Sequence, residues 1–200
     1  MNSEPSRQLS KSDLRQHLRQ ARAQLAADQR EMLNSAINRQ LIHYARHAGH
    51  RVVAAFVAFD GEPDLGPAMK QLESEGIRIA LPVIREASGR ADICFRHWSP
   101  ASDMQPNRYG IREPVGTLDV QLGEIDLVLI PLVAWDSSGG RLGMGASFYD
   151  RAFQPLEGER RPFRMGVAYQ LQQVERVPLE PWDVALHGVL TENGCLTCPF

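Results

Sequence analysis

A glycine-rich stretch with an arginine and an acid is the part of the sequence best suited to chemistry. It runs from Gly139 to Arg151 and reads GGRLGMGASFYDR. Glycines let backbone amides approach an anion closely, and Arg141 adds a permanent cation whose planar fork suits phosphate oxygens. The stretch is expected to follow a strand and to open a helix, whose positive end favours a phosphate. The pattern indicates a phosphate site.

The stretch matches neither of the familiar nucleotide loops. It lacks the Gly-Lys-Ser/Thr ending of a Walker loop, and Phe148 stands where the dinucleotide fingerprint has its third glycine. Two plainer interpretations stay open. The stretch could be a turn with a surface arginine, and Ser147 with Asp150 three residues later could be a capping box.

A basic stripe is expected on the first helix. Lys11, Arg15, Arg19 and Arg22 lie at i, i+4, i+8 and i+11, so they share one helical face. Such a stripe is either a solvated face or a phosphate-binding surface.

Two further patterns are not interpreted as sites. Cys195-x-x-Cys198 has no second Cys/His pair at zinc-finger spacing. His43 and His47 are one helical turn apart, but the glutamate of a His-Glu-x-x-His motif is missing.

The elements that must position these residues follow from the hydrophobic pattern. Apolar residues at helical spacing predict helices over 14–25, 32–49 and 65–76 and one starting at Ser147. Short apolar, β-branched runs predict strands over 52–59, 77–83, 91–98, 126–132, 165–169 and 189–191. Residues 100–116 read as a loop that faces a substrate.

Strands that alternate with helices predict an α/β fold. We expect a three-layer, Rossmann-like sandwich with a mostly parallel sheet and an N-terminal helical appendage. Residues 1–200 are expected to form a single domain, with a disordered leader over about residues 1–9.

Composition narrows the class of protein. Hydrophobic residues make up 43% and charged residues 23% of the 200 residues, and the net charge is -2, which disfavours a nucleic-acid binder. Three cysteines favour a reducing compartment. No apolar run is long enough to span a bilayer. A cytoplasmic monomer without nucleic-acid or membrane partners is expected.

Several segments together resemble the 5-formyltetrahydrofolate cyclo-ligase family. The most specific is the strand DLVLIPLVAWD followed by RLGMGASFYDR. The others occur in the family's order: Lys11 and Arg15, Glu62 and Asp64, Leu81-Pro82-Val83, residues 109–114 (YGIREP) and residues 181–184 (PWDV). The resemblance extends from about Lys11 to Glu192.

The resemblance implies an ATP- and Mg²⁺-dependent ring closure. The substrate is a reduced formylfolate, which can be polyglutamylated, and the products are 5,10-methenyltetrahydrofolate, ADP and phosphate. Phosphorylation of the formyl oxygen makes that oxygen a leaving group. The chemistry therefore calls for alignment and charge compensation.

The resemblance also implies roles for residues. Arg141 and Lys11 are the catalytic candidates, and Asp150 and Asp183 are the magnesium carboxylates. Nucleotide-binding positions are Lys11, Arg15, Arg141, Leu142, Gly143, Met144, Gly145, Ala146, Ser147, Phe148 and Tyr149. Folate-binding positions are Val57, Glu62, Tyr109, Phe148 and Tyr149.

The sequence departs from the family pattern at three positions. Ala146 and Ser147 stand where the family usually has glycine, and His187 stands where it often has an acid. Two alternatives stay open: a non-catalytic nucleotide or folate sensor, and another α/β phosphate-handling enzyme such as a sugar-phosphate isomerase or CoA transferase.

Overall fold

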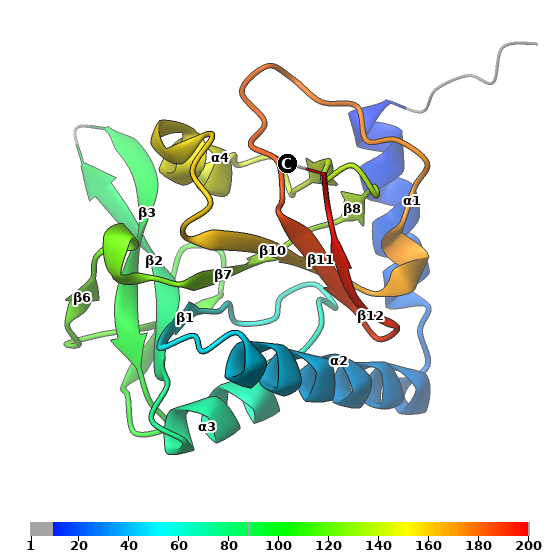
Figure 1. Cartoon of the computed structure of the whole chain (residues 1–200). Helices are drawn as coiled ribbons and strands as arrows, with labels where there is room; N and C mark the ends of the chain where they lie inside the picture. The colour runs from blue at the N-terminus through cyan, green and yellow to red at the C-terminus, as the bar shows by residue number, and fades with distance from the viewer. Residues whose placement is uncertain (1–9, 88, 200) are drawn as a thin grey trace, which may run out of the picture.

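The computed structural model describes residues 10–87 and 89–199, so the predicted leader lies outside the described residues. An eight-stranded sheet forms the centre (Figure 1). Its strands, in spatial order, are β12 (Gly194–Thr197), β11 (Gly188–Thr191), β10 (Phe163–Val167), β7 (Leu127–Pro131), β1 (Val52–Ala54), β2 (Arg78–Ala87), β3 (Arg90–Trp98) and β6 (Asp119–Val120).

Five central strands, from β11 to β2, are parallel, whereas β12, β3 and β6 pair antiparallel at the two edges. The central strands are apolar on both faces because both faces are covered. These findings confirm the predicted α/β class and the mostly parallel sheet. The strand predicted over 52–59 ends at Ala54, and the residues after it leave the sheet.

Two helices cover one face of the sheet, below it in Figure 1: α2 (Ala27–His47) and α3 (Gly66–Ser74). Ile37 and Leu41 of α2 pack against Leu72 of α3 and Leu129 of β7, all nearly inaccessible to solvent. α4 (Phe148–Phe153) lies on the opposite side of the sheet. Phe153 of α4 joins the second core there.

α1 (Lys11–Ala23) corresponds to the predicted N-terminal appendage. Leu14 and Leu18 pack on the segment after β7. Arg22 is fully buried and donates to the carbonyl of Leu132 (3.3 Å) and to Asp60 (3.0 Å). Arg22 therefore fixes α1 to the segments that follow β7 and β1.

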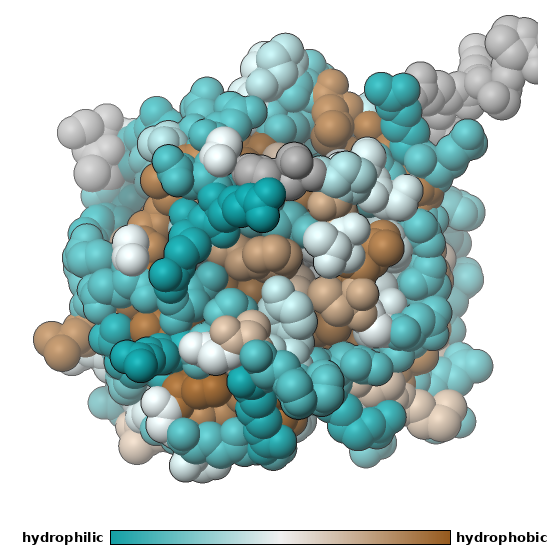
Figure 2. Space-filling model, in the orientation of Figure 1, coloured by the Kyte–Doolittle hydropathy of each residue, from teal (hydrophilic) through white to brown (hydrophobic). Residues whose placement is uncertain are grey.

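Two small hairpins complete the fold: β4 (Met104–Pro106) with β5 (Arg112–Pro114), inside the predicted loop 100–116, and β8 (Ala134–Trp135) with β9 (Arg141–Leu142). Short 3-10 turns span Leu122–Glu124, Gln154–Leu156 and Gln170–Gln172. Figure 2 shows one face of the molecule as mostly hydrophilic, with hydrophobic residues in scattered patches. Among the described residues, no helix combines the length and the apolar character needed to cross a membrane.

The β8–β9 hairpin separates the glycine-rich stretch into two parts. Gly139 and Gly140 lie at the hairpin tip, where a Cβ atom would come within 2.6 Å of the Leu186 carbonyl and 2.4 Å of the Asp136 carboxylate, respectively. Packing therefore requires these two glycines, and only the residues from Arg141 onward can face a ligand.

The buried carboxylate of Asp136 organises this hairpin. It accepts hydrogen bonds from the backbone N–H groups of Ser138 (2.9 Å), Gly140 (3.0 Å) and Val177 (2.8 Å). We predict that Asp136→Ala lowers the free energy of unfolding by about 3 kcal/mol, because it leaves these donors without an acceptor. Ser137→Ala, at the exposed neighbouring position, should stay within about 0.5 kcal/mol of the original chain. Equal urea midpoints for the two variants would contradict this role of Asp136.

Candidate functional site

A pocket of about 590 Å³ lies beyond the carboxyl ends of β1 and β7. Its walls come from α1, the segment after β1, the β4–β5 hairpin, residues 141–150 and residues 180–183. Ligand sites of open parallel sheets usually lie at this edge, because the loops that leave neighbouring strands diverge there.

All the residues predicted for the site line this one pocket. They are Lys11, Arg15, Val57, Glu62, Tyr109, Arg141, Leu142, Gly143, Met144, Gly145, Ala146, Ser147, Phe148, Tyr149, Asp150 and Asp183. The other half of the basic stripe points elsewhere: Arg19 and Arg22 both bind Asp60. The stripe is therefore divided between ligand-facing and structural cations.

The loop from Gly143 to Ser147 connects β9 to α4. Its Gly143 carbonyl accepts a hydrogen bond from Arg15 Nε at 2.8 Å, which joins the loop to α1. Gly145 has a φ of 100° and Ser147 a φ of 50°. The left-handed conformation of Ser147 is one that glycine adopts at lower cost, so the departure from the family pattern falls on a strained position.

The capping-box interpretation of Ser147 and Asp150 is wrong. The Ser147 side chain makes no capping hydrogen bond. Asp150 Oδ1 instead accepts from the guanidinium of Arg141 and from the backbone N–H of Val184 (3.2 Å). Arg141, only 7% exposed, also donates to the Val184 carbonyl. Together they connect β9, α4 and the C-terminal segment.

Asp150 and Asp183 each leave one carboxylate oxygen available. Asp183 accepts from Lys11 Nζ (2.9 Å) and from the Glu180 backbone (2.8 Å), both through Oδ2. Asp150 accepts only through Oδ1, and within residues 10–87 and 89–199 no hydrogen bond reaches Asp150 Oδ2 or Asp183 Oδ1. Within the same described ranges, no group of three or more His, Cys, Asp or Glu side chains is placed to hold a metal ion. The donor set fits Mg²⁺, which typically takes one or two carboxylates and completes its shell with phosphates and water.

Glu62 is a buried carboxylate in the wall of the pocket. Burial raises its pKa to about 7, although the hydrogen bond from the Phe59 backbone N–H (3.0 Å) and the charge of Arg22 act in the opposite direction. Only Oε2 is engaged by the Phe59 bond. Burial, and then the charge of Glu62, raise the pKa of the neighbouring Tyr149 phenol well above its usual range. Glu62 can therefore accept hydrogen bonds from a ligand through Oε1.

Aromatic rings also line the pocket. Phe148 meets Tyr109 edge to face with ring centroids 6.4 Å apart. Arg151 stacks over the Phe148 ring at 5.2 Å and donates to Asp92 and to the Ala146 carbonyl, both at 2.7 Å. Arg151 thereby attaches the end of the loop to β3.

The pocket also contains residues to which sequence reasoning assigned no role. Trp182, 54% exposed, and Phe59, 40% exposed, stand at the pocket with their rings accessible. Asn107 and Glu113 contribute polar groups from the β4–β5 hairpin. Trp182 and Glu113 stand inside the motifs PWDV and YGIREP. Those motifs were the sequence signal that could have identified them as pocket residues.

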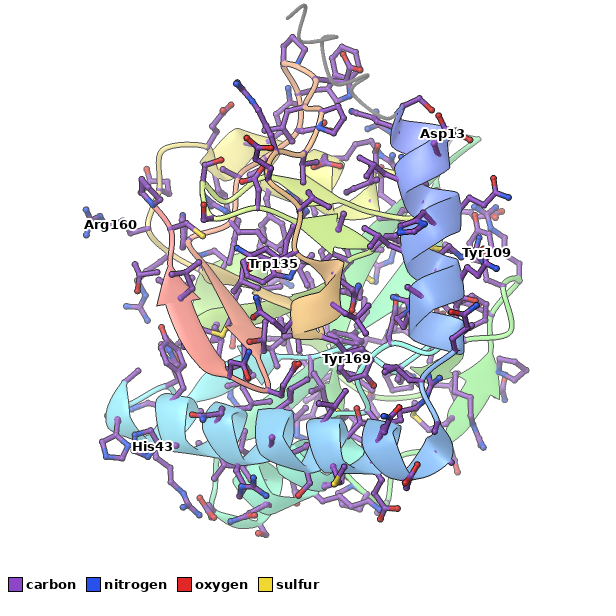
Figure 3. All side chains as sticks on the ribbon, turned by 90° about the vertical axis from the view of Figure 1, so that its right-hand side faces the viewer. Asp13, His43, Tyr109, Trp135, Arg160 and Tyr169 are labelled. Atoms are coloured by element: carbon purple, nitrogen blue, oxygen red, sulfur yellow. The ribbon has the colours of Figure 1, made fainter. Side chains whose placement is uncertain are left out.

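The histidine and cysteine patterns lie apart from the pocket. The His43 and His47 rings on α2 have centroids 3.9 Å apart and are tilted by 35°, with His43 at the outer edge of the molecule (Figure 3). Cys195 is exposed on β12, whereas Cys198 is buried. None of these four residues contributes to the pocket wall.

Comparison with known proteins places this geometry in a family. The sequence profile of the 5-formyltetrahydrofolate cyclo-ligase family matches residues 7–192. A protein from Escherichia coli (strain K12) named 5-formyltetrahydrofolate cyclo-ligase is 36% identical over 180 residues, which cover 88% of this chain and 97% of the relative. A Haemophilus influenzae protein of the same name is 33% identical over 184 residues, covering 90% and 96%.

A solved structure supports the same relationship. The NMR structure of Aquifex aeolicus 5,10-methenyltetrahydrofolate synthetase matches with a TM-score of 0.80 and 28% sequence identity, covering 96% of this chain and 94% of the other. The resemblance inferred from the motifs is therefore confirmed. The chain belongs to the 5-formyltetrahydrofolate cyclo-ligase family.

Proposed function

We propose that this protein closes 5-formyltetrahydrofolate to 5,10-methenyltetrahydrofolate at the expense of ATP. The observation that carries the proposal is that one pocket combines two kinds of wall. Lys11, Arg15 and Arg141 line it together with the glycine loop, and the buried Glu62 lines it together with apolar and aromatic side chains. Such a pocket suits a triphosphate that faces a flat, hydrogen-bonding ring.

The part of the pocket lined by the glycine loop is the proposed nucleotide site. Lys11 and Arg15 extend from α1 and Arg141 from β9, so cations approach the loop from two sides. Backbone amides of the loop, from Leu142 through Tyr149, are the proposed partners of the phosphates and of the rest of the nucleotide. Lys11 and Arg141 are the proposed catalytic residues, because preorganised cations stabilise the charge on a transferring phosphoryl group.

Asp150 and Asp183 are the proposed residues that hold Mg²⁺. When bound, the ion neutralises phosphate charge and fixes the orientation of the transferring group. Asp150 is itself fixed by Arg141, and Asp183 by Lys11. Each proposed carboxylate ligand is thus paired with one of the two proposed catalytic cations.

The part of the pocket around Glu62 is the proposed folate site. Glu62 is proposed to accept two N–H groups of the pterin ring, and Val57 to contact that ring from the segment after β1. Tyr109, Phe148 and Tyr149 supply aromatic surface on which flat rings can stack.

The proposed chemistry proceeds in two steps. The formyl oxygen attacks the γ-phosphorus, and ADP departs. N10 then attacks the activated formyl carbon, the carbon–oxygen bond breaks, and N10 loses its proton as phosphate leaves. The chain's contribution is to align the two substrates and to exclude water, which is the main demand of phosphoryl transfer.

The function is tested by following the absorbance of the methenyl product with purified protein. We predict a rise only when 5-formyltetrahydrofolate, ATP and Mg²⁺ are all present. Binding of nucleotide or folate without any rise would contradict the proposal and favour a sensor. A failure to bind either ligand would also contradict it.

Arg15 and Arg19 offer a matched pair on one helix. Arg15→Ala should raise the KM for ATP by about tenfold or more, because one charge-assisted hydrogen bond contributes roughly 1.5–3 kcal/mol. Arg19→Ala removes a cation one turn further along that binds Asp60 instead, and its KM should change less than about twofold. Similar KM values for the two variants would remove Arg15 from the nucleotide site.

Glu62→Gln should weaken folate binding and raise the free energy of unfolding. The pKa of about 7, against the ordinary 4.5, means that the ionised side chain destabilises the fold by roughly 3 kcal/mol above pH 7. This penalty shrinks as pH falls through 7 and vanishes below about 4.5. The variant should therefore be more stable than the original chain at pH 8, with a smaller advantage at pH 5.5.

The same variant should raise the KM for formylfolate at least about tenfold, since a neutral amide cannot accept both N–H groups. Glu31→Gln, at an exposed position of α2, is the matched control. It should leave the KM for formylfolate and the free energy of unfolding at both pH values unchanged. Glu62 loses its proposed role if Glu62→Gln keeps the original KM, or if its stability advantage does not depend on pH.

A further inference from the structure

Tyr109 has a defined place although its side chain is about half exposed. Its ring is 47% exposed and lies at the periphery of the molecule (Figure 3). It lines the pocket in edge-to-face contact with Phe148, and Arg108 stacks over its ring at 4.9 Å and donates to its hydroxyl at 3.0 Å. An exposed ring in a turn needs a backbone anchor to keep such a position.

Asn107 supplies that anchor. Its side-chain oxygen accepts from the backbone N–H of Tyr109 (2.9 Å) and of Ile111 (3.1 Å). Its backbone N–H donates to the Ile111 carbonyl (2.8 Å), and its carbonyl accepts from Gly110 (2.9 Å). Asparagine is favoured in such turns because its side chain can bond to the backbone two residues on. Asn107 thus closes the turn that carries Tyr109.

Glu113 connects this turn to the central sheet. Its Oε1 accepts from Asn107 Nδ2 at 2.6 Å and from the backbone N–H of Ile84 in β2 at 3.0 Å. Asn107, Glu113 and Ile84 all line the pocket. A continuous path of hydrogen bonds therefore runs from β2 through Glu113 and Asn107 to the backbone of Tyr109.

We propose that Asn107 and Glu113 are a positioning pair that fixes Tyr109 at the proposed folate site. The pair sets the affinity for the reduced formylfolate and leaves the affinity for the nucleotide unchanged. This inference rests on the proposed function. Its physical basis is preorganisation, because a ring already fixed in the bound geometry loses little conformational freedom when a ligand stacks on it.

Steady-state kinetics of turn variants test the pair. Asn107→Ala should raise the KM for formylfolate by about tenfold, or roughly 1.4 kcal/mol, with the KM for ATP within about twofold. Because Asn107 acts through Tyr109, the double variant Asn107→Ala/Tyr109→Ala should be no worse than Tyr109→Ala. Glu113→Gln retains an acceptor oxygen and should behave like the original chain, whereas Glu113→Ala should resemble Asn107→Ala.

The control is Gln105→Ala, at an exposed position of β4 in the same hairpin, which should leave both KM values unchanged. Hydrogen exchange gives a readout independent of turnover: the Tyr109 and Ile111 amides should exchange faster in Asn107→Ala than in Gln105→Ala. Additive effects of Asn107→Ala and Tyr109→Ala, equal changes in both KM values, or unchanged exchange would overturn the pair. An inactive original chain would overturn the proposed function, and the exchange rates would still decide whether Asn107 holds Tyr109.

Discussion

The buried ion pair between Arg141 and Asp150 is the interaction on which the pocket depends. A guanidinium that is only 7% exposed is costly to bury unless its charge and its donors are matched. Asp150 and the Val184 carbonyl provide that match. Since the three residues belong to β9, α4 and the segment before β11, the pair sets where the glycine loop lies relative to the C-terminal segment.

The same logic extends to the N-terminal helix. Arg22, in the last turn of α1, is fully buried and is matched by Asp60 and the Leu132 carbonyl. This docking places Arg15 and Lys11, about two and three turns nearer the start of the helix, at the pocket. Lys11 then meets Asp183 at 2.9 Å. The first two cations of the helix therefore face the pocket and the last two are structural, although their spacing looks uniform.

The sequence was sufficient to predict the mostly parallel sheet and a set of residues that line one pocket together. Apolar runs such as residues 127–131 report burial on both faces, and burial follows from local composition. The shared order of the family motifs assigned Glu62, Arg141 and Asp183 to one site, although these residues are far apart in the chain. The roles of Gly139, Gly140 and Asp150 could not be predicted in this way.

Those roles depend on partners that are distant in sequence. Gly139 is required because the Leu186 carbonyl passes close to it, and Asp150 binds Arg141 and Val184 in preference to a local cap. The Asn107–Glu113 contact likewise depends on Ile84 in β2. No local pattern encodes such contacts, since they arise only when the tertiary structure forms.

In the proposed reaction, one pocket brings the formyl oxygen to the γ-phosphate of ATP. The most direct measurement uses 5-formyltetrahydrofolate labelled with ¹⁸O in the formyl group and follows the label by mass spectrometry of the released phosphate. Activation by phosphoryl transfer predicts that the label appears in phosphate, one ¹⁸O for each methenyl product formed. Label released into water, with unlabelled phosphate, would contradict the account.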